Sequence, residues 1–352
     1  MKVKIDNILV IQELFSDRLD DVSTFLSEMN QSFSALKWQQ TLEWMYKDNP
    51  YIKNESLGWG ITEINTGKIF GFLGKIPVMY SNGMYLVNGY WLTSWCVKEE
   101  ARSLSLNLFN KVANSNDLLL SNTPTPFSIK IHNRFNFKRS NQVWGSKVLI
   151  YLLPYKILQG SYNILPKNKY AVLLLITRIL ITPFFLLLDF LTMFRYNIHV
   201  ITHFEYAEIK RIYYQNNSDT NLFFINDLDK LYGWLLCNKN FKDDFMCVGF
   251  YKKSHLIEAS IVKKTYFRNF RAWTCIDYIN NNKRISFFQR IVFLRHFVRI
   301  SNLNELLIWR SKSRDYCSWN FMLSFLKINA FYRYKTEIKI DESSIDGDHI
   351  FF

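Results

Sequence analysis

The sequence has 352 residues and a formal net charge of +14 at neutral pH, and 49% of its residues are hydrophobic. These values exclude a wholly disordered chain and predict two domains of ordinary size with well-filled cores. The positive charge indicates an anionic partner such as a nucleotide phosphate, a membrane surface or nucleic acid, although an A/T-rich coding sequence would also enrich the chain in lysine.

The cysteines indicate a reducing compartment. Their number is odd and no C-x-x-C pair occurs, so neither a disulfide framework nor a zinc site is expected. The N-terminal residues show no apolar core of the length that a signal peptide has. We therefore expect a cytoplasmic protein with buried thiols at Cys96, Cys237, Cys247, Cys275 and Cys317.

Helical and β-type patterns alternate over the first 150 residues. Apolar residues at helical spacing predict helices over 14–33, 38–46, 102–112 and 127–135. Runs rich in β-branched and aromatic residues predict strands over 58–64, 69–77, 85–97, 117–121 and 143–153. Asn65-Thr66-Gly67 is a hairpin signal between the first two strands. This order of elements is typical of a mixed α/β sheet.

Residues 170–194 are almost entirely apolar, and their length would suffice for a membrane span of about 20 residues. Two opposite charges and a proline interrupt the segment, and one crossing would separate the two halves of the protein. We therefore predict a helix that packs against protein or lies in the membrane interface, with basic flanks at Lys167, Lys169 and Arg195.

The second half repeats the order of the first. Strands are predicted over 245–252, 256–264, 271–279 and 305–309, with helices over 287–300 and 318–327. The matching order indicates an internal duplication. The predicted fold is therefore α/β (α+β), with two tandem mixed-sheet domains, 1–153 and 201–352, joined by an apolar helical linker over 154–200.

One motif in the first half carries a family resemblance. Val97-Lys-Glu-Glu-Ala-Arg102-Ser-Leu-Ser-Leu106 resembles the acyl-coenzyme A loop of the GNAT superfamily, V-x-P-E-x-R-G-x-G-L. Ile69-Phe-Gly71 is similar to the family's I-x-G strand, and His132-Asn-Arg134 lies where the family often has Y-x-K. The resemblance covers about residues 40–150, whereas residues 220–335 share only the order of elements.

The resemblance implies a site for acyl-coenzyme A. A helix N-terminus offers N–H groups and a positive dipole end to a pyrophosphate, which implies cofactor contacts at Arg102, Ser103, Leu104, Ser105 and Leu106. Serines stand at 103 and 105 where the family has glycines. The alternative is an ordinary helix start with serine as the cap. The pantetheine arm would lie between two diverging strands, against the backbone of Ser94, Trp95, Cys96 and Val97.

The resemblance also implies catalytic and acceptor residues. His132 lies where many members have an acid tyrosine, and histidine titrates near neutrality. Glu63, on an early strand, is the candidate general base. The second half lacks the loop and looks like a degenerate copy, in which Asp277 would contact the acceptor. The alternatives are a helix histidine without a catalytic role and a carboxylate satisfied within the fold.

The leading hypothesis is an acyl-coenzyme A-dependent N- or O-acyltransferase with acetyl-coenzyme A, or another acyl-coenzyme A, as co-substrate and no metal. Its acceptor would be an amino sugar or sugar hydroxyl of a cell-surface polysaccharide precursor, either a small molecule or lipid-linked. The alternatives are a Fem-type aminoacyltransferase that uses aminoacyl-tRNA and an inactive GNAT-like binding protein. We expect peripheral membrane contact through 170–194 at the inner face of the plasma membrane, and no nucleic-acid partner.

Overall fold

The computed structural model of the chain describes part of the sequence. The described residues are 8–31, 33–52, 56–81, 86–114, 118–121, 126–149, 180, 183, 186–187, 190–192, 194–200, 209, 223–224, 234, 244–267, 270–280, 289, 292–293, 296–297, 306–312 and 322–333. They form two units. Unit 1 comprises Met1–Asn141, Asp219–Trp234 and Asn329–Phe352, and unit 2 comprises Gln142–Ser218 and Leu235–Ile328.

Unit 1 contains a mixed sheet in the strand order β1-β2-β3-β4-β5-β13. The β1 to β4 pairings are antiparallel, β4 and β5 are parallel, and β13 is antiparallel to β5. A short strand, β8 (Phe223–Phe224), also pairs with β3. The other strands are β1 (Leu9–Phe15), β2 (Ser56–Glu63), β3 (Ile69–Ser81), β4 (Leu86–Val97), β5 (Leu118–Ser121) and β13 (Met322–Arg333).

Unit 2 contains strands in the order β7-β9-β10-β11-β12-β6. Its pairings are antiparallel except for the parallel pair of β11 and β12. The strands are β6 (Lys138–Leu149), β7 (Tyr196–Val200), β9 (Phe245–Lys252), β10 (His255–Phe267), β11 (Phe270–Asn280) and β12 (Leu306–Lys312). The single parallel pair holds the same place in both sheets, which confirms the predicted repetition of the mixed sheet.

Each sheet is completed by a strand from the other half of the sequence. β6 follows β5 in the chain but pairs with β12 through residues 144–148. β13 follows β12 but pairs with β5, with Phe331 opposite Ser121 and Arg333 opposite Leu119. In both units, one antiparallel strand follows the parallel pair, and this last strand comes from the other half of the sequence.

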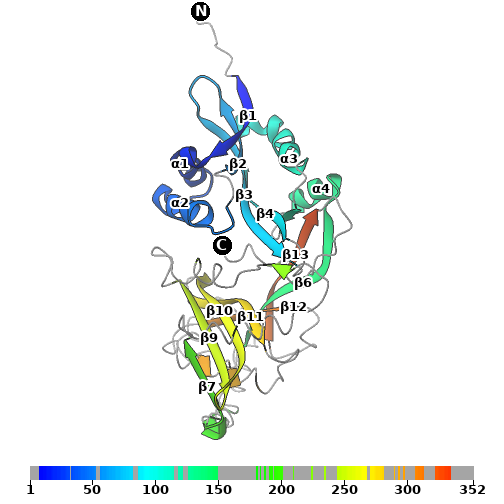
Figure 1. Ribbon diagram of the computed structural model, residues 1–352. Coiled ribbons are helices and arrows are strands. Elements are labelled where there is room, and N and C mark those ends of the chain that lie inside the picture. The colour runs from blue at the N-terminus through cyan, green and yellow to red at the C-terminus, as the bar shows by residue number, and fades with distance from the viewer. Residues whose placement is uncertain are drawn as a thin grey trace, which may run out of the picture. The chain divides into compact units, whose positions relative to one another are not determined.

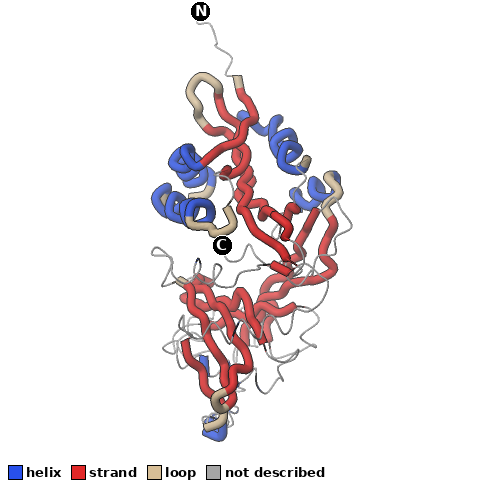
Figure 2. The backbone as a smooth tube through the Cα atoms, in the orientation of Figure 1, coloured by secondary structure: helices blue, strands red, loops and turns tan. Residues whose placement is uncertain are grey.

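Helices cover both faces of the unit 1 sheet. Helices α1 (Leu19–Met29) and α2 (Ala35–Leu42) lie on one face, and α3 (Ser105–Ala113) and α4 (Pro126–Arg134) lie on the other (Figures 1 and 2). Three short helical turns complete the unit: η1 (Ser16–Arg18), η2 (Glu43–Lys47) and η3 (Glu99–Leu104). Successive side chains of a strand point to opposite faces of the sheet. Leu73, for example, packs in the buried cluster around α3 that contains Leu108 and Phe109, whereas the neighbouring Phe72 is fully buried outside this α3 cluster.

Local sequence explains these elements. α2 begins at Ser34, whose hydroxyl accepts the backbone N–H of Lys37 and so satisfies one open donor of the first turn. The turn between β2 and β3 contains Gly67 at a φ of 69°, a left-handed conformation that glycine adopts at little cost. That hairpin matches the prediction from Asn65-Thr66-Gly67.

Trp234 packs against Trp44 within unit 1. The indole N–H of Trp234 donates to the backbone carbonyl of Trp44 at 2.8 Å, and the Trp44 indole donates to the Trp234 carbonyl at 3.2 Å. Both side chains are buried, and Tyr51 packs edge-on against Trp234. Both indole donors are thus satisfied, as buried polar groups require.

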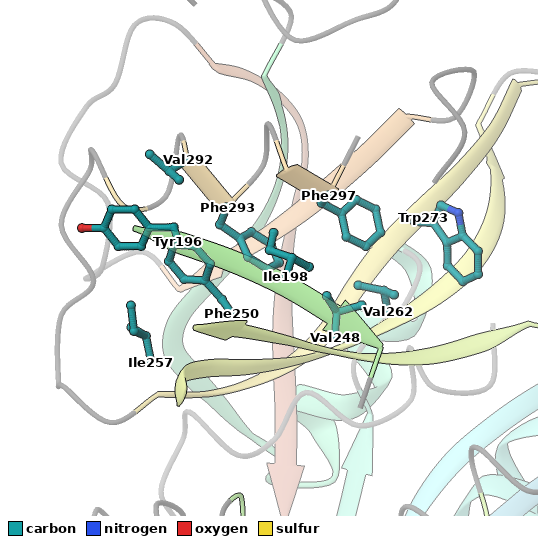
Figure 3. Close-up of a cluster of buried hydrophobic side chains, with 10 residues drawn as sticks. All are labelled: Tyr196, Ile198, Val248, Phe250, Ile257, Val262, Trp273, Val292, Phe293 and Phe297. Carbon is teal, nitrogen blue, oxygen red and sulfur yellow. The ribbon is translucent and has the colours of Figure 1, made fainter. Parts of the chain in front are cut away.

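The core of unit 2 lies between its sheet and a helical segment (Figure 3). Phe293 and Phe297, both helical, are buried with Val292 against Tyr196, Phe250 and Trp273. Tyr196 stacks on Phe250 with ring centroids 5.4 Å apart. The described residues at 289–297 are helical, in agreement with the helix predicted over 287–300.

Three predictions about elements were wrong. Residues 322–333 form β13, although the sequence predicts a helix over 318–327. Residues 9–15 form β1 and α1 starts at Leu19, whereas the predicted helix began at residue 14. Residues 196–200, placed in the linker by the sequence, form β7. Each missed strand has partners that are distant in the sequence or starts from an edge position, which local patterns do not reveal.

The predicted domain boundaries, at 153–154 and 200–201, fall at or within residues outside the described ranges, and the division into consecutive segments stays a prediction. Among the described residues, no helix combines the length and the apolar character that a membrane crossing needs.

Candidate functional site

Strand β4 changes course at Ser94. The β3–β4 register shifts between Phe72 and Gly74, and Ser94 has a φ of 52°. A non-glycine residue rarely adopts this left-handed conformation, which here forms a β-bulge. Thr93 and Ser94 lie with their hydroxyl oxygens 3.3 Å apart at this bulge.

The bulge lies just beyond the end of the parallel β4–β5 ladder. Pairing extends only from Gly89 opposite Leu118 to Trp91 opposite Leu120, while β4 continues to Val97. Beyond Trp91, β4 continues to pair with β3 at Leu92, Thr93, Cys96 and Val97. The predicted divergence of these two strands beyond this ladder stays a prediction.

The chain after β4 forms a helical turn earlier than the sequence predicts. The turn η3 spans Glu99–Leu104 and leads directly into α3 at Ser105. The backbone N–H of Ala101 donates to the Lys98 carbonyl, and that of Ser105 is bonded to the Arg102 carbonyl. A 3-10 turn directs N–H groups to the carbonyl three residues before. At least the Ser105 amide is therefore already engaged.

The side chains of the predicted loop differ in exposure. Arg102, Ser103 and Leu106 are exposed, Leu104 and Ser105 are half-buried, and Ala101 is buried in the α3 cluster. Glu99 and Glu100 occupy the first turn, where carboxylates interact favourably with the helix dipole. The exposed cation at 102 and hydroxyl at 103 are thus the groups that a ligand can reach.

The ring of Phe109 joins three predicted site elements. Its centroid lies 4.8 Å from that of Trp95 on β4 and 5.2 Å from that of His132 on α4. Phe109 is 1% exposed. The sequence marks this residue only as one apolar position of a helix, and its role in placing Trp95 could not be read from spacing.

His132 lies within this aromatic cluster. Its side chain is 3% exposed, its ring meets Phe137 edge-on, and its Nδ1 lies 2.7 Å from the Ser128 carbonyl oxygen. Burial lowers the pKa of His132, and the Ser128 carbonyl opposes part of that effect. The ring packs as part of the core, and its role as an acid stays a prediction.

Glu63 is hydrogen-bonded within the β2–β3 turn, and Cys96 is half-buried on β4. The Glu63 carboxylate accepts a hydrogen bond from the Thr66 hydroxyl, and the Glu63 backbone closes the β2–β3 turn with Lys68 and Gly67. Cys96, on β4, is half-buried, and burial raises the pKa of its thiol. The geometry therefore gives Glu63 a structural task in the turn, and its role as a base stays a prediction.

Unit 2 repeats the bulge in its own sheet. The β10–β11 register shifts between Ile261 and Val262, so that Ile261 pairs with Asp277 and Val262 with Cys275. The parallel β11–β12 ladder ends at Cys275 opposite Trp309. Asp277 therefore occupies the first paired position beyond the bulge, and its contact with an acceptor stays a prediction.

The sequence matches no protein-family model and no curated protein, but the structure resembles known folds. A GCN5-related N-acetyltransferase from Anabaena variabilis has a TM-score of 0.56 at 8% identity, with 93% of this chain and 72% of that chain covered. The N-myristoyltransferase of Saccharomyces cerevisiae with bound myristoyl-CoA has a TM-score of 0.54 at 11% identity, covering 93% and 79%. These likenesses show that the chain has the GNAT fold.

A third similar structure is one region of a larger enzyme. The GCN5-related glucosamine N-acetyltransferase region of a fungal multi-domain GH3 beta-N-acetylglucosaminidase has a TM-score of 0.55 at 10% identity. It covers 93% of this chain but 38% of that chain. At such identities the similarity establishes the fold alone.

Proposed function

We propose that the protein is an acyl-coenzyme A-dependent acyltransferase whose thioester donor binds to unit 1. The observation that carries the proposal is the bulge at Ser94 beside the end of the β4–β5 ladder. There the main chain of β4 continues beyond its last described pair with β5, and the amide groups of a pantetheine arm have the chemistry to pair with the N–H and C=O groups of a strand. The likeness to an N-myristoyltransferase with bound myristoyl-CoA supports this placement.

The pyrophosphate would lie at the start of the following helix. The Ser105 N–H already donates to the Arg102 carbonyl. Side chains would therefore supply some of the hydrogen bonds to the pyrophosphate that backbone N–H groups make where the family has glycines. Arg102 offers a guanidinium that can bind two phosphate oxygens, and Ser103 offers a hydroxyl donor. Both side chains are exposed.

The proposed reaction is direct acyl transfer. The acceptor amine or hydroxyl attacks the thioester carbonyl, the carbon–sulfur bond breaks, and the acyl group leaves coenzyme A as a thiolate. The attacking group loses a proton to a base, and the thiolate gains one from an acid. His132 and Glu63 are the candidate acid and base. His132→Gln and Glu63→Gln test them, since a catalytic role lowers turnover much more than donor affinity.

The proposed acceptor is an amino sugar or sugar hydroxyl of a cell-surface polysaccharide precursor, nucleotide- or lipid-linked, with acetyl-coenzyme A as donor and Asp277 near the acceptor. The net charge of +14 suits an anionic carrier group. The likeness to a glucosamine N-acetyltransferase region supports the amino sugar. We place this reaction in the cytoplasm, at the inner face of the plasma membrane.

Calorimetric titration of the purified chain with coenzyme A tests donor binding. Wild type should bind, and Arg102→Glu should lose at least about tenfold in affinity, because a charge-assisted contact with the phosphate becomes a repulsion. Lys111→Glu, an exposed charge reversal on the same helix, is the matched control and should bind as wild type.

Thiol release tests the chemistry. Wild type with acetyl-coenzyme A should release free thiol when a nucleotide-linked amino sugar is added, and should not do so without an acceptor. Donor binding without turnover for any sugar acceptor would remove the sugar assignment. Absence of both binding and turnover would overturn the acyltransferase and leave a GNAT-like binding protein.

A further inference from the structure

The described residues between 180 and 194 of unit 2 include many exposed large apolar side chains. Phe194 is 78% exposed, Leu180 is 72% exposed, and Phe190 and Leu191 are each 62% exposed. Leu186 and Leu187 are also more than half exposed. The other exposed large apolar side chains of the described residues are spread along the chain. A soluble surface rarely gathers so many, and such a patch marks an interaction site.

These side chains share one face of a helix. At about 100° per residue, the positions of the exposed residues fall within an arc of about 140°. The arc comprises the helical residues Leu180, Pro183, Leu186, Leu187, Phe190 and Leu191, and the exposed Phe194 in the turn that follows completes the set. Thr192, which is 4% exposed, falls on the opposite side. The helix therefore presents its apolar face outward, and we name this set of residues the apolar face.

The apolar face is anchored to the core of unit 2. The Arg195 backbone N–H donates to the Thr192 carbonyl at 3.0 Å, and the next residue, Tyr196, stacks on Phe250 in the core. This helical segment lies at the end of the sheet formed by β7 and β9 (Figure 1). The face is therefore held in place at its C-terminal end.

Basic residues border that end of the apolar face. The backbone N–H of Lys253 donates to the Arg195 carbonyl at 2.9 Å, and Lys252 pairs with Tyr196 in the β7–β9 ladder. Arg195 and Lys253 are exposed. An apolar helix face with cations at its edge is the pattern of a segment that lies in the interface of an anionic bilayer, with its apolar side chains among the acyl chains and its cations at the headgroups.

We infer that unit 2 binds the surface of a membrane containing anionic lipids through the apolar face, with Arg195 and Lys253 on the headgroups. The face inserts only to the depth of an interfacial helix and does not cross the bilayer. Binding of this kind requires no acyl transfer. It would nevertheless hold the protein where lipid-linked acceptors are found.

Sedimentation of the full chain with vesicles tests the inference. Wild type should bind phosphatidylcholine vesicles that contain phosphatidylglycerol, bind pure phosphatidylcholine much more weakly, and lose affinity as salt is added. The triple variant Leu187→Ser, Phe190→Ser, Phe194→Ser should lose at least about a hundredfold in partitioning. Phe127→Ser removes an apolar side chain that is 72% exposed in unit 1, and should bind as wild type.

The cations are tested separately. Arg195→Gln with Lys253→Gln should lose about twentyfold on anionic vesicles and little on neutral ones, whereas the exposed Lys130→Gln in unit 1 should have no effect. Because the substituted side chains are exposed, the thermal unfolding midpoint should not change.

Three outcomes would overturn the inference: no binding of wild type to anionic vesicles, equal binding by the triple variant, or equal binding to neutral vesicles. A triple variant that converts a wild-type dimer into a monomer, with no vesicle binding by either, would assign the apolar face to contact between two copies of the chain.

Discussion

Removal of the Phe109 ring is expected to destabilise unit 1 strongly. The ring is 1% exposed and lies within 5.2 Å, centroid to centroid, of Trp95, Phe135 and His132. Phe109→Ala removes a fully buried aromatic side chain and leaves a cavity between α3, α4 and β4. Losses of about 3–5 kcal/mol in the free energy of unfolding are typical of such a change. Alanine favours the helix, so no loss of helix propensity contributes.

The measurement is urea unfolding followed by indole fluorescence, because Trp95 is in contact with the ring. Leu106→Ala, on the same helix but 41% exposed, is the matched control and should change the free energy by less than about 0.5 kcal/mol. Coenzyme A affinity should fall for Phe109→Ala, since Trp95 and the neighbouring Ser94 lose their support. A loss in stability below about 1.5 kcal/mol would refute the view that this ring organises the cluster.

Three further predictions concern backbone geometry and pH. Gly58→Ala should cost at least about 2 kcal/mol in urea unfolding, because φ is 141° and the added Cβ would lie 2.2 Å from the Leu73 carbonyl oxygen. Gly67→Asn should cost less than about 1 kcal/mol, because φ is 69° and the added Cβ would meet only the Arg18 guanidinium at an ordinary 3.6 Å; equal costs would contradict this. Ser94→Gly should change stability by less than about 1 kcal/mol while Ser94→Val loses more than that, and the reverse order would exclude the left-handed bulge. Burial lowers the pKa of His132, so below about pH 6.5 the unfolded chain binds more protons than the folded chain, and the free energy of unfolding falls on acidification. His132→Gln should reduce the dependence of the free energy of unfolding on pH, and an unchanged dependence would contradict the lowered pKa.

The elements that the sequence predicts well are those with local signals. The β2–β3 hairpin follows from Asn65-Thr66-Gly67, and β4 and the following helix from aromatic and apolar spacing. The segment Phe321-Met-Leu-Ser-Phe-Leu has apolar residues that fit either a helix or a strand. Its partner β5 lies about 200 residues earlier in the chain, so only tertiary pairing decides in favour of β13.

The sequence predicts the secondary structure around the candidate site but little of its geometry. The order of β4, the turn and α3 follows from the motif around Arg102. The bulge at Ser94 has no local sequence signal, because serine shows little preference for a left-handed φ. The sequence does not indicate whether the His132 side chain faces a substrate or the protein core. Its packing against Phe109 and Phe137 is visible only in the structure.

The exchange of β6 and β13 has consequences for how the chain can be made and cut. During synthesis, about 200 further residues are made after β5 before its partner residues Phe331–Arg333 emerge from the ribosome. Until then the edge of β5 that pairs with them is open and can pair with other chains. A fragment ending near residue 150 would keep β6 without β12 and β5 without β13. Such a fragment is expected to aggregate or to form swapped oligomers.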